Sequence, residues 1–354
     1  MIPRPSTQRP FIVPVFIPHA GCPHRCVFCN QRGTTGKGEA IPATDELHSA
    51  ITRFLKFKKD PARYTEISFY GGNFLGLPAQ EAIRLMEACT PYIHRGMAQG
   101  IRFSTRPDTI DAQRMALISD FPVTTIELGV QSMRDSVLKA CRRGHTVSQV
   151  REAVALLKQT PRRIGLQMMV GLPGDTLSSS LATGRHIADL EPDFVRIYPT
   201  LVLKGSVLAD WYATGRYAPL SLEEAVDIVK ALYRHFAERR INVIRMGLQA
   251  TEGLDNRSDM VAGPYHPAFG ELVLAALWLS AMRTAMSDNT IPQGPVTITL
   301  HPRLVSRVQG YRCSNLNALR DEFSVPAFAL STTDDLPLDE IRMNGRPCRL
   351  FNKS

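Results

Sequence analysis

The chain has 354 residues, of which 44% are hydrophobic and 21% are charged, a composition typical of a globular protein with a large buried core. No stretch reads as apolar enough to cross a bilayer, so no membrane partner is expected. The formal net charge of +9 is compatible with an anionic partner, such as nucleic acid or a phosphate-rich substrate. It is equally compatible with a basic surface that has no partner.

The N-terminal segment combines arginines with an apolar run, as a secretion signal does. Pro14 and Pro18 interrupt that run, however, and it is short for a signal with a cleavage site. We therefore expect a buried strand over Phe11–Ile17. Seven cysteines, an odd number with one tight cluster, favour a reducing compartment over a disulfide framework, so the protein is predicted to be cytoplasmic.

Short apolar runs alternate with longer amphipathic segments over the first 250 residues. Strands are predicted over Phe11–Ile17, Glu66–Tyr70, Ile101–Thr105, Thr125–Leu128, Ile164–Val170 and Phe194–Tyr198. Helices are predicted over Asp45–Phe57, Gln80–Ile93, Asp111–Ser119, Ser148–Leu157, Leu177–Leu190 and residues 221–240. Such alternation indicates parallel strands joined by crossover helices, an α/β fold. Six units fit a partial (β/α)6 barrel of the TIM type or a doubly wound sheet.

The pattern changes near residue 250. Residues 250–270 are rich in glycine, proline and polar side chains, so a long surface loop is predicted there. A helix over Glu271–Met286 and a strand over Val296–Leu300 are predicted to follow. The chain is therefore divided into a core, residues 1–250, and a small α+β C-terminal extension, residues 251–354.

Unusual residues fall at the ends of the predicted strands. They are the three cysteines Cys22, Cys26 and Cys29, then "YGGN" (70–73), "STRPD" (104–108), "ELGVQS" (127–132), "GLPG" (171–174) and "YPT" (198–200). In parallel α/β folds the functional residues collect on loops after the carboxyl ends of strands. Together these segments indicate one active site, at the edge of the sheet where the carboxyl ends of the strands meet.

The cysteine spacing is C-x3-C-x2-C. A structural zinc site would need a fourth Cys or His, and although His19 and His24 are near, no second close pair follows. Thiolates also bind iron–sulfur clusters, and three of them leave one iron of a [4Fe–4S] cube open to a substrate or cofactor.

This spacing, with the aromatic Phe28 before the last cysteine, resembles that of the radical S-adenosylmethionine (SAM) enzymes. The resemblance implies a partial barrel in which Cys22, Cys26 and Cys29 hold a [4Fe–4S] cluster and SAM binds the open iron. An electron donor such as flavodoxin or ferredoxin would reduce the cluster. SAM would then be cleaved to a 5′-deoxyadenosyl radical that abstracts hydrogen from a substrate.

The same resemblance implies SAM contacts at the other strand ends. Arg143 with Gln131 is expected near the SAM carboxylate, since a guanidinium clamps a carboxylate through two hydrogen bonds. The further cofactor-binding candidates are Phe28, Gly71, Gly72, Asn73, Ser104, Arg106, Glu127, Gln167 and Gly171. Asn73 stands where the family usually has Glu or Thr. Two alternatives remain open, because "GLPG" is also a common turn and Glu127 is also suited to a buried ion pair.

Four segments make the resemblance more specific. They are "STRPD", "ELGVQS", "RRGHT" (142–146) and "RIYPTLVLKGSVLADWYATGRY" (196–217), and they are similar to the radical SAM core of the Elongator catalytic subunit. That family modifies the wobble uridine of transfer RNA. The chain is expected to lack the acetyltransferase domain of that family, and its cysteine loop is more compact. Transfer RNA is therefore the leading candidate substrate. The alternatives are a small-molecule substrate, or a non-catalytic iron–sulfur protein within an RNA-binding complex.

Other polar and sulfur-containing residues are given structural roles. The basic segments Arg53–Lys59, Arg142–Arg143, Arg162–Arg163 and Arg239–Arg240 are interpreted mainly as solvated helix faces. The scattered cysteines Cys89, Cys141, Cys313 and Cys348 are interpreted as inert thiols. His145 is considered for orienting a substrate, whereas His301 is expected to be structural.

Overall fold

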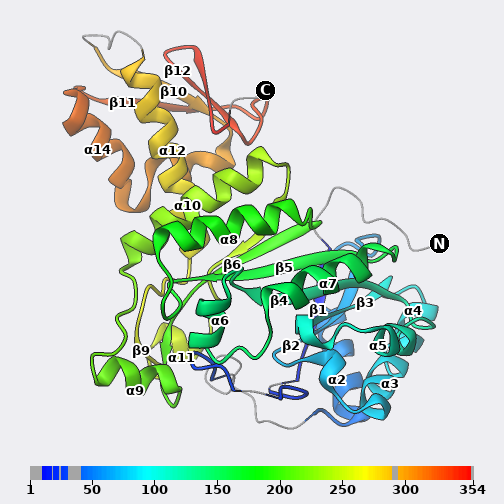
Figure 1. Ribbon diagram of the computed structural model, residues 1–354. Helices are drawn as coiled ribbons and strands as arrows, with labels where there is room; N and C mark the ends of the chain where they lie inside the picture. Colours follow the sequence, from blue (N-terminus) through cyan, green and yellow to red (C-terminus); the bar gives the residue numbers. More distant parts are fainter. Residues whose placement is uncertain (1–9, 18, 24, 31–40, 289–293, 352–354) are drawn as a thin grey trace.

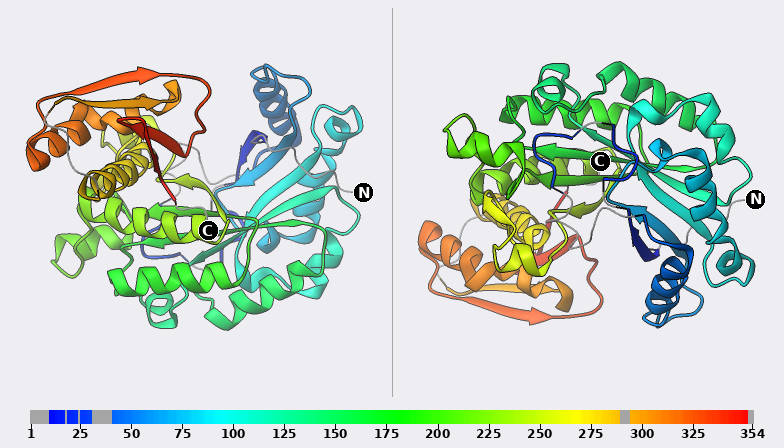
Figure 2. Two further views of the ribbon diagram at one scale, coloured as in Figure 1. Left: turned by 90° about the horizontal axis from the view of Figure 1, so that it is seen from above. Right: turned by 90° about the horizontal axis from the view of Figure 1, so that it is seen from below.

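The computed structural model describes residues 10–17, 19–23, 25–30, 41–288 and 294–351. Its main feature is a curled sheet of seven parallel strands in the order β1-β2-β3-β4-β5-β6-β8 (Figures 1 and 2). The strands are β1 Phe11–Phe16, β2 Thr65–Tyr70, β3 Gly100–Thr105, β4 Val123–Gln131, β5 Arg163–Val170, β6 Phe194–Pro199 and β8 Asn242–Met246. The predicted α/β partial barrel is confirmed.

The sheet has one strand more than the six predicted. β8 lies at the sheet edge beside β6, and its first residue is exposed while the other four are half-buried. An edge strand has a single neighbour and needs no fully buried apolar run. Its five residues, Asn-Val-Ile-Arg-Met, therefore carry too weak a pattern for prediction from sequence.

Helices connect the strands. They are α2 Thr44–Leu55, α3 Ala79–Glu87, α4 Thr90–His94, α5 Ala112–Leu117, α6 Asp135–Ala140, α7 Val147–Lys158, α8 Leu177–Asp189, α9 Val207–Ala213 and α10 Leu222–Glu238, with the short 3-10 turns η1 Phe74–Gly76 and η2 Pro107–Thr109. The predicted helix Gln80–Ile93 is divided into α3 and α4. Pro91 lies in the first turn of α4, where its missing N–H costs nothing, and it cannot continue a preceding helix. The short helix α6 was not predicted.

The two faces of the sheet differ in polarity. One face carries Ile67, Phe69, Phe103, Leu128 and other apolar side chains, which form the main core with the helices. Because side chains alternate along a strand, the intervening residues point to the concave face. They include Glu66, Ser68, Arg102, Ser104, Glu127, Gln167, Arg196 and Tyr198. A polar concave face is thus built into the strand sequences.

The predicted loop after residue 250 contains two short elements. They are α11 Glu252–Asp255 and β9 Met260–Ala262, and β9 pairs antiparallel with β7 Val202–Leu203. The predicted surface loop is thus interrupted by these two elements, which the sequence analysis did not predict. Elements of four and three residues are too short to produce a periodic pattern in the sequence.

α12 Phe269–Ser287 joins two apolar cores. Phe269, Val273 and Leu277 belong to the main core, while Trp278 and Met282 belong to a second core. By length and composition alone α12 could cross a bilayer, so the expectation that no stretch is apolar enough was wrong. The core helix of a globular protein has the same length and composition, and α12 packs on both cores.

The second core lies under a four-stranded sheet in the order β11-β10-β12-β13. Its strands are β10 Val296–Leu300, β11 Phe328–Thr332, β12 Glu340–Met343 and β13 Arg346–Arg349. The turns η3 Pro302–Leu304 and η4 Tyr311–Cys313 and the helices α13 Val305–Gln309 and α14 Ser314–Phe323 complete this extension. Figure 1 shows it at one end of α12, beside the curled sheet.

Candidate active site

The three clustered cysteines lie on the loop after β1. The Cys22 amide donates to the His19 carbonyl at 3.2 Å, and the Cys29 amide donates to the Cys26 carbonyl at 3.0 Å. Cys26 is buried, while Cys22 and Cys29 are half-buried. Among the described residues, no three His, Cys, Asp or Glu side chains are arranged to hold a metal ion. The structure therefore places the thiols on one loop without gathering them into a metal site.

The end of β2 packs against this loop through glycines. A Cβ on Gly72 would lie 2.5 Å from the carbonyl oxygens of both Ile17 and Ala20, and a Cβ on Gly21 would lie 2.2 Å from the Asn73 carbonyl oxygen. The Asn73 amide donates to the Ala20 carbonyl at 2.8 Å. Gly72 is thus required for close approach to the cysteine loop, whereas Gly71 has a positive φ of 95°.

Asn73 joins the cysteine loop to the end of β3. Its Nδ2 donates to the Gly21 carbonyl at 2.9 Å. Its Oδ1 accepts three hydrogen bonds, from Thr105 Oγ1 at 2.7 Å, the Arg106 amide at 3.0 Å and Thr109 Oγ1 at 2.9 Å. The side chain has no exposed surface. Asn73 thus positions two loops relative to each other, and its expected contact with SAM stays a prediction.

Arg143 reaches the cysteine loop from the segment after α6. Its Nη1 lies 3.4 Å from Cys26 Sγ, and its Nη2 donates to the Gly129 carbonyl at 2.7 Å. A Cβ on Gly129 would stand 2.6 Å from that Nη2, so glycine makes room for the guanidinium. Gln131 follows with φ +70° at an irregularity between β4 and β5, and it accepts from Gln167 Nε2 at 3.4 Å.

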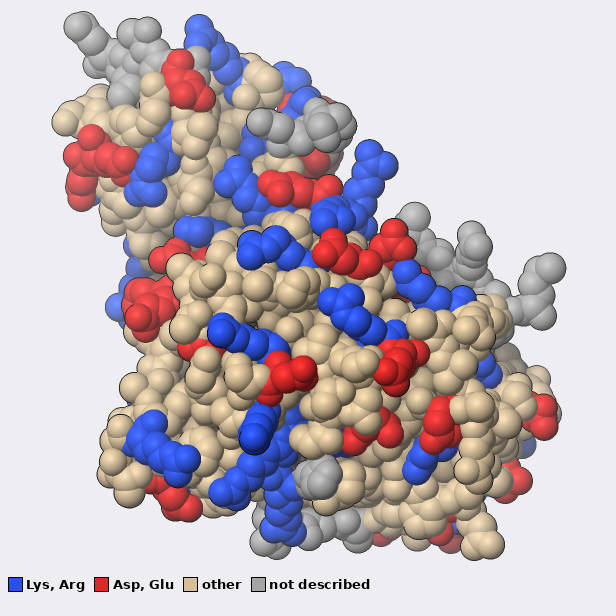
Figure 3. Space-filling model, viewed as in Figure 1, with Lys and Arg blue, Asp and Glu red and all other residues tan. Residues whose placement is uncertain are grey.

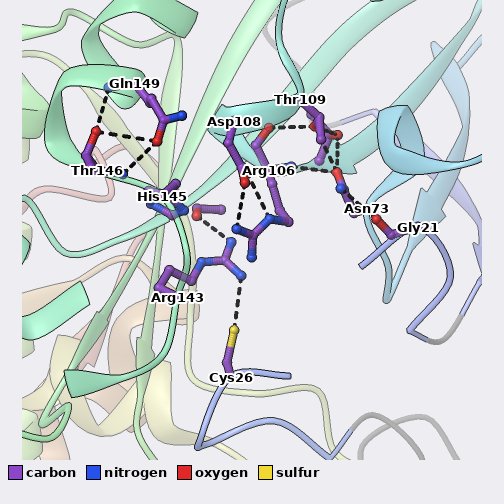
Figure 4. Close-up of polar contacts among 12 residues, drawn as sticks. Gly21, Cys26, Asn73, Arg106, Asp108, Thr109, Arg143, His145, Thr146 and Gln149 are labelled. Carbon is purple, nitrogen blue, oxygen red and sulfur yellow. Dashed lines mark hydrogen bonds and ion pairs between the residues drawn. The ribbon is translucent and has the colours of Figure 1, made fainter. Parts of the chain in front are cut away.

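Figure 4 shows Arg106 and His145 beside Arg143. Arg106 donates from Nε and Nη2 to the Asp108 carboxylate at 2.9 and 2.8 Å. His145 Nε2 lies 3.2 Å from the Val130 carbonyl, so Nε2 carries the proton. Burial, and then the Arg143 and Arg106 charges, lower the pKa of His145 to about 3. The imidazole is therefore neutral.

Among the described residues, three buried polar atoms in this group have no hydrogen-bond partner: Arg106 Nη1, Arg143 Nε and His145 Nδ1. All three side chains are at least nine-tenths buried. An unpaired buried polar group is costly, so such atoms are typical of a position where a bound ligand supplies the partner. Two guanidinium groups against one carboxylate make the position suitable for an anionic group.

Glu127 belongs to a separate ion-pair network on the concave face. Its carboxylate accepts from Arg102 Nε at 2.5 Å and lies 2.7 Å from Arg196 Nε. Burial would raise the pKa of Glu127, but Arg102 and Arg196 hold that pKa below its ordinary value. Arg102 also pairs with Glu66 at 3.2 Å. The structure thus shows the ion pair that the sequence also allowed, with both carboxylate oxygens held by Arg102 and Arg196, and the expected SAM contact of Glu127 stays a prediction.

The remaining predicted contacts divide between two places. Ser104 is half-buried on the concave face, in register with Glu127. Phe28 packs against an apolar cluster that includes Val27 and Cys141. Gly171 has φ +74° and its carbonyl accepts from the Tyr217 hydroxyl at 2.6 Å. It lines a cavity of about 450 Å³ together with Trp211, Arg216 and Tyr217.

Sequence reasoning missed the partners that complete these groups. Arg102, Arg196 and Tyr70 surround Glu127, and Tyr70 accepts from Arg196 at 3.0 Å. Asp108 holds Arg106, and Thr105 and Thr109 hold Asn73. Asp108 could have been predicted from the sequence, since it is the last residue of the "STRPD" segment. Nothing in the local pattern of β3 or β6 pointed to Arg102 or Arg196.

By their chemistry, the residues around the cysteine loop fit an iron–sulfur cluster beside a cofactor that carries a carboxylate. The donor set is three thiols on one loop, which suits such a cluster better than it suits zinc. Arg143 already approaches Cys26, and the unpaired N–H groups at Arg106 Nη1 and Arg143 Nε suit a carboxylate, whereas His145 Nδ1 carries no proton and is an acceptor. The cluster would be held by Cys22, Cys26 and Cys29.

The chain is similar to known proteins along most of its length. Residues 16–183 match the radical SAM superfamily, and residues 192–278 match the radical SAM C-terminal domain. The tRNA uridine(34) acetyltransferase of Dehalococcoides mccartyi is 26% identical over 230 residues, which are 56% of this chain and 50% of that protein. Elongator complex protein 3 of Saccharomyces cerevisiae is 33% identical over 133 residues, 37% of this chain and 24% of that protein.

The fold also matches a solved structure. Archaeal Methanocaldococcus infernus Elp3, with an N-terminal deletion, superposes with a TM-score of 0.59 at 21% identity, over 75% of this chain and 62% of that chain. The chain spans about half the length of the tRNA uridine(34) acetyltransferases that it matches. From the domain matches, the fold and the cysteine loop, we conclude that this chain belongs to the radical SAM superfamily of enzymes, whose cofactors are a [4Fe–4S] cluster and SAM.

Proposed function

We propose that this radical SAM enzyme modifies a uridine base in transfer RNA. The observation that carries the proposal is its similarity to relatives named tRNA uridine(34) acetyltransferase, which spans 56% to 62% of this chain. A net charge of +9 is compatible with a polyanionic substrate. The chain spans only about half of those relatives, so the proposal concerns the radical step and not the acetyl transfer in their names.

Each residue near the cysteine loop has a role in the proposal. Cys22, Cys26 and Cys29 hold the cluster. When bound, the cluster and SAM supply a carbon-centred radical that removes a hydrogen atom from the substrate. Arg143 lies against both Cys26 and the Gly129 carbonyl, so its direction is fixed before a ligand arrives. It orients the carboxylate of SAM.

Arg106 and His145 complete that carboxylate position. Asp108 holds two of the Arg106 nitrogens, which leaves Nη1 for a ligand. Neutral His145 adds no further positive charge, and its burial keeps water away from the guanidinium groups. Gln131, Gln167 and Ser104 are proposed to contact the rest of SAM from the concave face.

The proposal is tested by SAM cleavage with and without RNA. The protein is loaded anaerobically with iron and sulfide, reduced with dithionite, and incubated with SAM and either unmodified tRNA or an anticodon stem-loop. We expect 5′-deoxyadenosine to form, to increase when a uridine-containing anticodon loop is present, and to disappear in Cys26→Ser. Cleavage that no RNA stimulates would favour a small-molecule substrate.

A second test uses the cell. Deleting the gene is expected to change the modified nucleosides at the wobble position of bulk tRNA, as measured by mass spectrometry. Complementation with Cys26→Ser should not restore them, while the wild-type gene should. An unchanged nucleoside profile would contradict the tRNA proposal.

A further inference from the structure

Three exposed cations lie together at α6: one on the helix, one directly before it and one two residues after its end. Arg134, Lys139 and Arg142 are all exposed, and within the described part of the chain none of them forms an ion pair. We name them the α6 patch. Asp135 is the one acidic residue between them, and its carboxylate accepts from the Val147 amide at 2.8 Å. The surface therefore presents uncompensated positive charge.

The α6 patch borders a hollow. Lys139 and Arg142 line a surface cavity of about 430 Å³ together with Asp135, Gly144, His145 and Thr146. Figure 3 shows Lys and Arg side chains gathering on this face, over and below the position of α6 in Figure 1. A hollow rimmed by unpaired cations suits an acidic protrusion of a partner protein.

The cysteine loop lies directly behind this patch. The Val27 amide, between Cys26 and Cys29, donates to the Cys141 carbonyl at 3.1 Å. Val137 and Cys141, on the inner side of α6, share an apolar cluster with Val27. Arg142 is bonded to Arg143, whose guanidinium lies 3.4 Å from Cys26 Sγ. On this side of the molecule, the α6 patch and the cysteine loop are thus separated by about one helix diameter, roughly 10 Å.

We propose that the α6 patch is the docking site of a small acidic electron-carrier protein, a flavoprotein or an iron–sulfur protein. This inference rests on the radical SAM chemistry proposed above, which needs a reduced cluster. In the transfer step one electron leaves the reduced carrier and enters the cluster, so the carrier is oxidised by one electron. No bond forms or breaks. The patch holds the carrier beside the hydrogen bond that joins the Val27 amide, next to Cys26, to the Cys141 carbonyl.

The observations favour an electron carrier over nucleic acid at this surface. Three cations form a small footprint, whereas proteins that follow a phosphate backbone commonly contact roughly six to ten phosphates. A substrate base must also reach the concave face, where Ser104 and Gln167 lie. An electron has only to reach the cysteine loop. Cys141, directly after α6, contacts that loop at Val27.

Charge reversal of the patch tests the proposal. The variant Arg134→Glu/Lys139→Glu/Arg142→Glu is compared with Arg53→Glu/Lys56→Glu/Lys59→Glu, which makes the same change in charge at the end of α2, another exposed basic segment. A milder variant, Arg134→Gln/Lys139→Gln/Arg142→Gln, covers the case in which reversal disturbs folding. The probe is a purified acidic flavodoxin, and its affinity for the cluster-loaded full-length chain is measured at two salt concentrations.

We expect the reversed patch to weaken flavodoxin binding by about tenfold or more at low salt, and the glutamine variant to weaken it less. SAM cleavage driven by reduced flavodoxin should fall in parallel. Cleavage driven by dithionite, which needs no docking surface, should stay within about twofold of wild type, as should iron content. The α2 control should bind flavodoxin like the wild type.

Several results would overturn the proposal. Unchanged flavodoxin affinity in both patch variants would do so, and so would an equal loss with both reductants, because the patch would then act on the cluster itself. Loss of tRNA affinity with intact flavodoxin binding would assign the surface to RNA. Failure of the wild-type protein to cleave SAM with dithionite would count against the proposed function instead, since the binding titration still reports on docking.

Discussion

Two buried polar groups lie on the same sheet, and they differ in how their charges are matched. On the concave face, Glu66 and Glu127 are paired with Arg102 and Arg196, two carboxylates with two guanidinium groups. Near the cysteine loop, Arg106 pairs with the carboxylate of Asp108, whereas Arg143 pairs with no carboxylate, and three polar atoms have no partner among the described residues. The first group is balanced and the second is cationic.

This difference separates a structural role from a binding role. Removing one member of a balanced buried group leaves an uncompensated charge, so the cost appears in stability. Removing a member of the cationic group leaves fewer unpaired donors, so the cost appears in ligand affinity. Arg102 also stacks on Phe194 at 4.7 Å, which adds packing to its ion pairs.

The largest effect is expected from Glu127→Ala. The change leaves Arg102 and Arg196 buried without their shared carboxylate, and breaking such a group costs about 3–5 kcal/mol. Urea unfolding of the full chain measures it, with Glu127→Gln as the isosteric control that should lose less. A decrease below about 1 kcal/mol would show that the network is not structural.

A smaller loss of stability, about 3 kcal/mol, is expected for Asn73→Ala. Two buried threonine hydroxyls and the Arg106 amide lose their common acceptor, and the Gly21 carbonyl loses its donor. Because Asn73 ties the cysteine loop to β3, the variant should also retain less iron after reconstitution. Wild-type stability together with wild-type iron content would contradict the positioning role of Asn73.

Arg143→Gln is expected to show the opposite signature. SAM affinity should weaken by about 2 kcal/mol, roughly thirtyfold, because a charged hydrogen-bond donor to its carboxylate is lost. The free energy of unfolding should change by less than about 1 kcal/mol, since no carboxylate pairs with Arg143 within the described residues. Equilibrium dialysis with SAM and urea unfolding measure the two quantities. A large loss of stability with unchanged SAM affinity would instead assign Arg143 a structural role.

The smallest effect is a pH dependence from His145. Its pKa in the folded chain is about 3, below the ordinary value of 6.5, so the folded state binds fewer protons than the unfolded state between these values. The stability contribution is therefore complete above pH 6.5 and declines on acidification. It should fall by about 1.4 kcal/mol from pH 7 to pH 5.5. His145→Gln should remove that part of the pH dependence of the free energy of unfolding. The same dependence on pH in the variant and the wild type would contradict the prediction.

The sequence alone determined the parts of this protein that depend on local pattern. Six strands of the sheet follow from apolar runs, and the C-x3-C-x2-C spacing with its neighbouring strand ends predicts the chemistry. The Ser221 capping box marks the start of α10, and the structure confirms it. Each of these features is contained in a short window, which is why it can be read without coordinates.

Only the tertiary structure decided which polar residues are structural and which are available to a ligand. Glu127 finds its partners 25 and 69 residues away, and Asn73 finds acceptor and donor partners 52 and 36 residues away. Parallel strands joined by crossover helices bring such distant positions into register. A lone Glu or Asn in the sequence does not show whether a partner will be there, and burial makes the presence or absence of that partner decisive.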